Sequence, residues 1–327
     1  MIARLLQCLV GLALLAAGLW SVWCWQHGLG PGWWLLGLLL TLAPHAGLLA
    51  LEFLLLALLG RDPDVPRASA GQLLRAWWGE VLAAWRVLGW LLPFAAGSEP
   101  DGPGVTDPRG RTGVLLLHGL FCNRGIWTPW LRELRQRGVP CTALTLTPAF
   151  GSIDRYHRAI DAAVLDLRQR TGRPPLLVGH SMGGLSARSW LAGQADAMAA
   201  DARVTGVITI GTPHHGTAMA RFGLTTNTRQ MRRGSAWLTA LAAHEPAERR
   251  ARFTCFYGNA DNIVFPASTA TLASADNRHL SGVAHVQMVF EPAVFAEVLR
   301  RVGSVGGGGA GAAGGATGGV AGDPLPR

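Results

Sequence analysis

A serine stands between glycines directly after a short apolar run. The run covers residues 175–180 and leads into G-H-S-M-G at residues 179–183, with a further glycine at position 184. When such a serine occupies the sharp turn between a strand and a helix, small residues two positions on either side let the two elements approach closely. Its hydroxyl then lies at the carboxyl end of a sheet and at the N-terminus of a helix, where negative charge is favoured. The pattern predicts Ser181 as a nucleophile.

A serine hydroxyl becomes a good nucleophile only when a neighbouring base removes its proton, so a histidine held by a carboxylate is needed. In this type of site the acid, and then the histidine, follow the serine along the chain. Asp261 lies in G-N-A-D-N-I-V-F-P after the apolar run 252–257, and we predict it as the acid. An Asx turn is the structural alternative for Asp261, and Asp276 is the next candidate acid. The predicted base is His285 in S-G-V-A-H-V-Q-M, with His279 as its competitor.

Backbone N–H groups are needed to hold the oxyanion that forms on a substrate carbonyl. One is expected from Met182, which follows the nucleophile, and one from the loop after the first core strand. That loop begins at His118-Gly119, so Leu120 is the predicted second donor and Phe121 the alternative. We expect His118 to fix the loop rather than to transfer protons. The histidines near the site lack a third partner at metal-ligand spacing, so we predict no metal site and no cofactor.

Short apolar runs alternate with helix-like segments from residue 113 onwards. The apolar runs are residues 113–118, 141–146, 175–180, 204–210 and 252–257, and the helix-like segments are residues 126–137, 153–170, 182–191 and 292–302. This alternation predicts a mostly parallel sheet with helices on both faces. We expect this domain to occupy residues 113–302. Residues 303–327, nearly all Gly and Ala, are expected to form a disordered tail.

Residues 113–302 resemble bacterial lipases and esterases of the α/β-hydrolase superfamily. The resemblance rests on H-G-L at 118–120, P-L-L-V-G-H-S-M-G-G at 175–184, I-G-T-P-H-H-G-T at 210–217, and the two segments around Asp261 and His285. It implies an α/β-hydrolase fold with a small helical cap at about 217–250. The cap carries apolar residues at roughly helical spacing, namely Met231, Trp237, Leu238 and Leu241. They suit either an amphipathic lid over an acyl pocket or an ordinary packed helix.

Two long apolar runs precede the catalytic domain. Residues 5–25 carry no charge, and residues 33–59 carry only Glu52. Because about 20 apolar residues cross a bilayer, we predict two transmembrane helices within residues 1–60. A cleavable signal peptide is the alternative for the first run. The loop 26–32 has no arginine, whereas arginines precede the first run and follow the second. The positive-inside rule therefore predicts a multi-pass protein of the inner membrane with both ends and the catalytic domain in the cytoplasm.

Residues 61–112 connect the two regions. Apolar residues recur there at helical spacing, namely Leu74, Trp77, Trp78, Val81, Trp85 and Leu88. They predict a helix that lies either along the membrane surface or against the catalytic domain. Residues 97–113 are rich in Gly, Pro and Asp and are typical of a linker.

The composition narrows the possible partners. The formal net charge of +9 comes entirely from arginine, and no basic run with interleaved aromatic residues occurs in the catalytic region. This argues against nucleic-acid binding and favours attraction to anionic lipid headgroups. Five cysteines without C-x-x-C spacing predict neither a disulfide framework nor a zinc site.

We therefore expect a membrane-anchored serine hydrolase acting on ester or lipid substrates. Two alternatives remain open. The same triad can transfer an acyl group to an alcohol other than water, and a domain of this type can serve as a non-catalytic membrane scaffold that only binds.

Overall fold

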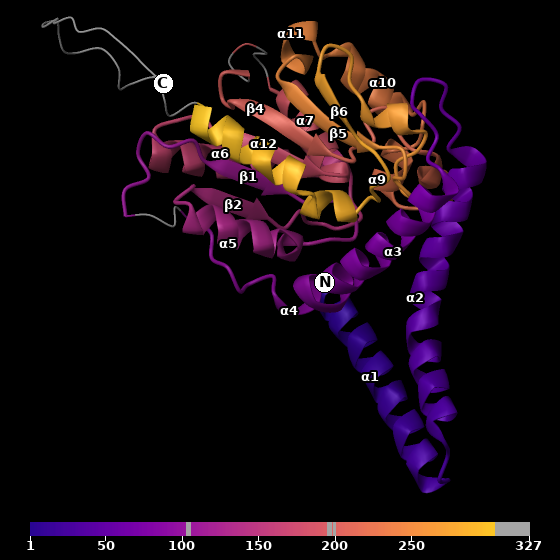
Figure 1. Ribbon diagram of the computed structural model, residues 1–327. Coiled ribbons are helices and arrows are strands. Elements are labelled where there is room, and N and C mark those ends of the chain that lie inside the picture. Colours follow the sequence, from indigo (N-terminus) through magenta and orange to yellow (C-terminus); the bar gives the residue numbers. More distant parts are fainter. Residues whose placement is uncertain (103–105, 195–197, 199–200, 305–327) are drawn as a thin grey trace, which may run out of the picture.

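A parallel sheet of six strands forms the centre of the molecule (Figure 1). The computed structural model describes residues 1–102, 106–194, 198 and 201–304. The strand order is β2-β1-β3-β4-β5-β6, and every neighbouring pair is parallel. The strands are β1 (Val114–Leu117), β2 (Cys141–Leu144), β3 (Leu176–His180), β4 (Gly206–Ile210), β5 (Phe253–Gly258) and β6 (Asp276–Leu280). The mostly parallel sheet predicted from the strand and helix alternation is confirmed.

Helices cover both faces of the sheet, as parallel strands with helical crossovers require. They are α5 (Thr128–Gln136), α6 (His157–Thr171), α7 (Met182–Ala192) and α12 (Pro292–Ser304). Alternate residues of each strand point to opposite faces. Leu115 and Leu117 therefore pack with α6 and α7, whereas Val114 and Leu116 pack with α5 and α12. Because both faces are buried, β1 reads as a continuous apolar run.

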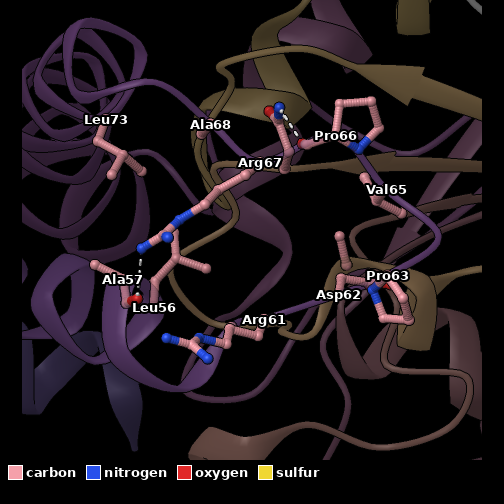
Figure 2. A pocket seen from close by; sticks show the side chains of 13 residues that line it. Leu56, Ala57, Arg61, Asp62, Pro63, Val65, Pro66, Arg67, Ala68 and Leu73 are labelled. Atoms are coloured by element: carbon pink, nitrogen blue, oxygen red, sulfur yellow. Dashed lines mark hydrogen bonds between the residues drawn. The ribbon is translucent and has the colours of Figure 1, made fainter.

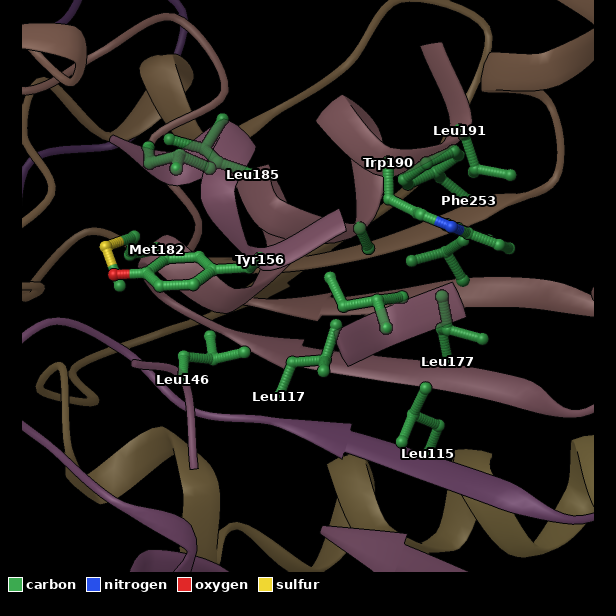
Figure 3. Packing of buried hydrophobic residues seen from close by; sticks show 14 of the residues in the cluster. Leu115, Leu117, Leu146, Tyr156, Leu177, Met182, Leu185, Trp190, Leu191 and Phe253 are labelled. Carbon is green, nitrogen blue, oxygen red and sulfur yellow. The ribbon is translucent and has the colours of Figure 1, made fainter. Parts of the chain in front are cut away.

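The core on the α6 and α7 side contains the residues around the nucleophile turn (Figure 3). Leu117, Met182 and Leu185 are almost completely buried within it. Burying one such side chain stabilises the folded state by about 1.5–3 kcal/mol. The turn at Ser181 is thus built on a rigid, closely packed base.

The predicted cap region lies between β4 and β5 and consists of short helices. They are η4 (Ala218–Phe222), α9 (Thr226–Gln230), α10 (Ala236–Ala243) and α11 (Ala247–Arg250). In α10, Leu238 and Leu241 are buried in the same core as α7. A buried ion pair joins the region after α10 to α7, with Arg188 Nε donating to Glu245 Oε1 at 3.0 Å. In this structure α10 is a packed helix, the second of the two alternatives that its sequence left open.

Two long apolar helices project from this domain as a hairpin (Figure 1). They are α1 (Ile2–Gln26) and α2 (Pro31–Leu59), and both are long and apolar enough to cross a membrane. Only 6% of the most apolar window of α1 and 17% of that of α2 is buried, so these helices differ from core helices of similar hydropathy. The connecting loop lies at the far end of the hairpin, and both open ends lie beside the catalytic domain.

A third helix lies between the open ends of the hairpin and the sheet domain (Figure 1). This helix, α3 (Ala70–Arg86), continues through a π-helical turn, η1 (Val87–Leu91), into α4 (Leu92–Phe94). It begins at a capping box formed by Ser69 and Gln72. One face of α3 is buried through Ala76, Glu80 and Val81. An opposing set of large apolar side chains in this segment stays exposed, namely Leu74, Trp78, Leu82, Trp90 and Phe94.

The remaining elements are short 3₁₀ turns. They are η2 (Arg124–Trp127), η3 (Ile153–Tyr156), η5 (Ala267–Ala270) and η6 (Gln287–Phe290). The last helix, α12, ends at Ser304, and the predicted tail beyond it lies outside the described residues.

Candidate active site

Ser181 occupies the turn between β3 and α7 with a backbone that side chains rarely adopt. Its φ is +54° and its ψ is −126°. A non-glycine residue in such a conformation costs about 1–3 kcal/mol and persists only where the surroundings enforce it. Here the Ser181 N–H donates to the carbonyl oxygen of Ile210 at 2.8 Å, and Thr212 Oγ1 donates to the Ser181 carbonyl oxygen at 2.9 Å. The serine is therefore held from the end of β4 as well as by its own turn.

Close backbone contacts explain the glycines around Ser181. A Cβ atom at Gly183 would lie 2.2 Å from the carbonyl oxygen of Leu117, and one at Gly179 would lie 2.4 Å from the N–H nitrogen of Gly184. Real Cβ atoms do not approach other atoms so closely. The tight approach of strand and helix that the sequence predicted at these two positions is present in the structure.

Asp261 and His285 lie together at the carboxyl edge of the sheet. The Nδ1 atom of His285 is 3.0 Å from each carboxylate oxygen of Asp261. Asp261 Oδ1 also accepts hydrogen bonds from the N–H groups of Ile263 at 2.9 Å and Val264 at 2.7 Å, which fix the carboxylate in the turn after β5. Both side chains of the pair are buried. Burial alone would lower the pKa of His285, but the charge and hydrogen bond of Asp261, together with the charges of Glu80 and Glu52, outweigh this effect and raise the pKa.

Two residues next to Ser181 or its backbone partner lie close to the Asp261–His285 pair. Gly211 follows Ile210, the partner of Ser181, and a Cβ atom there would lie 3.0 Å from both Asp261 Oδ2 and His285 Nδ1. His180 precedes the serine, and its ring centroid is 4.7 Å from that of His285. Among the described residues no hydrogen bond joins Ser181 Oγ to His285 Nε2. Such bonds often tighten only when substrate is bound.

The loop after β1 runs past the nucleophile. A Cβ atom at Gly119 would lie 2.9 Å from Ser181 Cβ, so Leu120 enters the site directly after a contact with the serine. Phe121 has φ of +58°, which marks a sharp turn at this point. In the described part of the chain neither the Leu120 N–H nor the Met182 N–H donates a hydrogen bond to another backbone group. Both predicted oxyanion donors are therefore without an internal acceptor among the described residues.

His118 holds this loop in place. Its Nδ1–H donates to the carbonyl oxygen of Gly119 at 2.7 Å, and its Nε2 accepts from the N–H of Leu146 at 2.9 Å. Burial lowers the pKa of His118 to about 4. The imidazole is therefore neutral at physiological pH and ties the loops after β1 and β2 together, as expected from its position.

The competing candidates lie elsewhere. Asp276 begins β6, where it pairs in register with Thr254 at the amino edge of the sheet, and its carboxylate binds Arg278 at 2.7 Å. His279 lies within β6, with its ring centroid 5.2 Å from that of Tyr257. The structure does not bring either residue to Ser181.

Two residues beside the site were not singled out as site residues from the sequence. Asn262 Oδ1 accepts a hydrogen bond from the His285 N–H at 3.2 Å. Glu80 on α3 accepts hydrogen bonds from the N–H groups of Val286 and Gln287. Asn262 follows the predicted acid and could have been considered, whereas no local pattern connects Glu80 with a loop about two hundred residues later.

Comparisons with known proteins agree with this architecture. Residues 114–309 match the model of the alpha/beta hydrolase family. A Bacillus licheniformis lipase, BlEst2 in its mature form, superposes with a TM-score of 0.51 at 18% identity over 62% of this chain and 99% of that chain. Aspergillus fumigatus lipase B superposes with a TM-score of 0.50 at 19% identity over 61% of this chain and 54% of that chain. No curated protein matches the sequence.

The family match covers more than half of the chain and includes the strand, turn and helix around Ser181. The two lipase structures share the fold at low identity. The predicted fold class and the predicted resemblance are confirmed, and the predicted class of enzyme, a carboxylic ester hydrolase, agrees with them. The chain belongs to the alpha/beta hydrolase family.

Proposed function

We propose that this protein is a membrane-anchored serine hydrolase that cleaves lipid-like carboxylic esters through Ser181, His285 and Asp261. One observation carries the proposal. A buried Asp261–His285 pair at 3.0 Å lies beside the strained turn that presents Ser181. A base held by a carboxylate next to a serine is the arrangement that serine hydrolases need.

In the proposed reaction, His285 Nε2 takes the proton of Ser181 while the serine Oγ attacks the ester carbonyl. The N–H groups of Leu120 and Met182 hold the resulting oxyanion. Collapse of the intermediate releases the alcohol, which receives its proton from His285 and leaves an acyl-enzyme. Water then attacks the acyl group with His285 again as base, and the carboxylic acid departs. Asp261 orients the imidazole and stabilises its charged form.

The membrane part of the proposal rests on two exposed apolar surfaces. Helices α1 and α2 have a mean hydropathy of 2.0 in their most apolar windows. The exposed side chains of the α3 to α4 segment, Leu74, Trp78, Leu82, Trp90 and Phe94, would lie at the bilayer surface beside the open ends of the hairpin. Such a segment with aromatic and aliphatic side chains is suited to the headgroup region.

An apolar cavity supports the choice of substrate. It has a volume of about 430 Å³ and lies between the start of α1 and the loops after β1 and β2. Cys122 and Asn123 of the loop after β1 line it, together with Leu146 and Ala149 of the loop after β2. Leu146 belongs to the same packed cluster as Met182. In this proposal the acyl chain of the substrate occupies the cavity beside the start of α1.

A series of p-nitrophenyl esters from acetate to palmitate tests the proposal on the full chain in detergent. Each methylene that enters an apolar cavity contributes about 0.8 kcal/mol, so kcat/KM should rise with chain length well beyond butyrate. Ser181→Ala should lower turnover of every ester by about a thousandfold or more and leave the protein folded. A maximum at acetate or butyrate would contradict the lipid-like substrate. A Ser181→Ala variant that stays within a few-fold of wild type would contradict the mechanism.

A further inference from the structure

Helix α2 carries one charge within its apolar run, and that charge points to the active site. Asn262 Nδ2 donates to Glu52 Oε2 at 2.6 Å. Asn262 follows Asp261 in the chain, and its Oδ1 accepts a hydrogen bond from the His285 N–H at 3.2 Å. A carboxylate that is withdrawn from water needs hydrogen-bond partners that replace its hydration. The partner of Glu52 is thus the residue that connects the proposed acid with the proposed base.

Helix α3 reaches the loop of His285 with a second carboxylate. Glu80 is 1% exposed, and its oxygens accept from the Val286 N–H at 2.9 and 3.0 Å and from the Gln287 N–H at 3.0 Å. Within the described part of the chain Glu80 forms no ion pair. A buried carboxylate is tolerated only where hydrogen bonds replace its lost hydration. Here the donors are the two residues that follow His285.

The segment between α2 and α3 is tied to both loops as well. Asn259, just before the acid turn, donates to the Pro66 carbonyl oxygen at 2.9 Å and accepts from the Gly282 N–H at 2.8 Å. Asn259 and Pro66 both line a cavity between α2, the segment 60–68 and the catalytic domain, and Figure 2 shows Pro66 among its lining residues. Gln72 Nε2 donates to Ser281 Oγ at 2.8 Å. Helix α3 therefore contacts the loop of His285 both before the histidine, at Ser281, and after it, at Val286 and Gln287.

We propose that Glu80 and Glu52 are positioning residues of the active site, which hold the His285 loop and the Asp261 turn in place from helices α3 and α2. The membrane-side helices are then part of the active site and do more than tether it. This inference rests on the proposed function, because it takes His285 and Asp261 as base and acid.

The same carboxylates influence the charge of the base. Asp261, Glu80 and Glu52 face His285 from the turn after β5, from α3 and from α2, and His180 faces it from β3. Burial lowers the pKa of His180 well below its usual value, so that ring is neutral. Burial raises the pKa of Glu80 to about 7. The negative charge of Glu80 favours the protonated His285 and contributes to its raised pKa. Because His285 must be neutral to act as a base, activity is lost as pH falls through the pKa of His285.

The test compares substitutions in the full chain in detergent by the pH profile of kcat/KM and by thermal unfolding. Glu80→Gln removes the charge while keeping the size, so the acidic limb of the profile should move to lower pH. Glu80→Ala should lower kcat/KM up to about 100-fold, the loss that a small displacement of a catalytic group can cause. Glu52→Ala should also lower kcat/KM, and Glu52→Gln, which keeps an acceptor for Asn262, should restore most of it.

Glu297→Gln is the matched control. Glu297 is a buried carboxylate on α12 that binds Arg278, Arg300 and Arg301, away from Ser181. Its substitution should lower the unfolding temperature and leave the acidic limb and kcat/KM as in wild type. If Glu80→Ala does not fold, Glu80→Gln and Glu52→Ala decide.

This inference alone would be overturned if Glu80→Gln and Glu52→Ala both matched wild type in kcat/KM and in the acidic limb while Ser181→Ala was inactive. An active Ser181→Ala would instead overturn the proposed function.

Discussion

His285 is held through both of its backbone polar groups and through one ring nitrogen. Its N–H donates to Asn262, its carbonyl oxygen accepts from His180 Nε2 at 3.2 Å, and its Nδ1 faces Asp261. The remaining ring nitrogen, Nε2, is the one that the proposed mechanism needs for Ser181. In this geometry Nδ1 of the imidazole binds the proposed acid, and Nε2 is left to accept the proton of Ser181.

Asp261→Asn tests this assignment at the residue scale. The amide cannot stabilise the charged imidazole and can present its N–H₂ to Nδ1, so the ring can take the wrong tautomer. We expect kcat to fall by about 10⁴-fold, as for other carboxylates in this role. The matched control is Asp276→Asn, because Asp276 lies at the opposite edge of the sheet and binds Arg278. Kinetics with a p-nitrophenyl ester would contradict the assignment if Asp276→Asn were the more damaging change.

At the scale of elements, the turn from β3 to α7 depends on close contact with β1. Gly183→Ala would place a methyl group 2.2 Å from the Leu117 carbonyl oxygen, which is backbone and cannot move aside easily. We expect the free energy of unfolding to fall by about 1–3 kcal/mol or more and activity to fall with it. Gly303→Ala on α12 is the control, because nothing lies within 4 Å of its Cβ position. Chemical denaturation of both variants would contradict the expectation if they were equally stable.

The sequence predicts the elements of the sheet domain well, because their signals are local. The five apolar runs became β1 to β5, and the space between Asp261 and His285 holds β6. The polar strand Asp276–Leu280 carries no apolar run that would fix its bounds. The sequence also did not determine which surface the apolar side chains of α3 contact. Its stripe of tryptophans and leucines fits a membrane or a protein surface, and the structure buries one face and exposes another.

Residues of the candidate site could be predicted where one short motif contains the chemistry. Ser181 and its glycines, and the order of acid and base, follow from such motifs. The contact of Glu80 with Val286 joins residues 206 positions apart, and that of Glu52 with Asn262 joins residues 210 positions apart. No local rule relates residues at such separations, so these contacts needed the structure.

At the scale of the whole molecule, the hairpin has both open ends on the side of the catalytic domain and its loop at the far end (Figure 1). The loop 26–32 has no arginine, and the segments at the open ends carry several. We predict that both termini are cytoplasmic. A fusion of green fluorescent protein to the C-terminus should fluoresce, and a fusion of alkaline phosphatase there should be silent. An active phosphatase with a dark fluorescent protein would place the catalytic domain outside the cytoplasm.

The central claim is that Ser181 is the nucleophile of a serine hydrolase, and covalent labelling tests it most directly. A fluorophosphonate reacts with a serine that a neighbouring base activates. The full chain in detergent should bind one phosphonate, and mass spectrometry of its peptides should place the adduct on Ser181. Ser181→Ala should remain unlabelled. An adduct on another residue, or ester turnover by the wild type without any adduct on Ser181, would contradict the account.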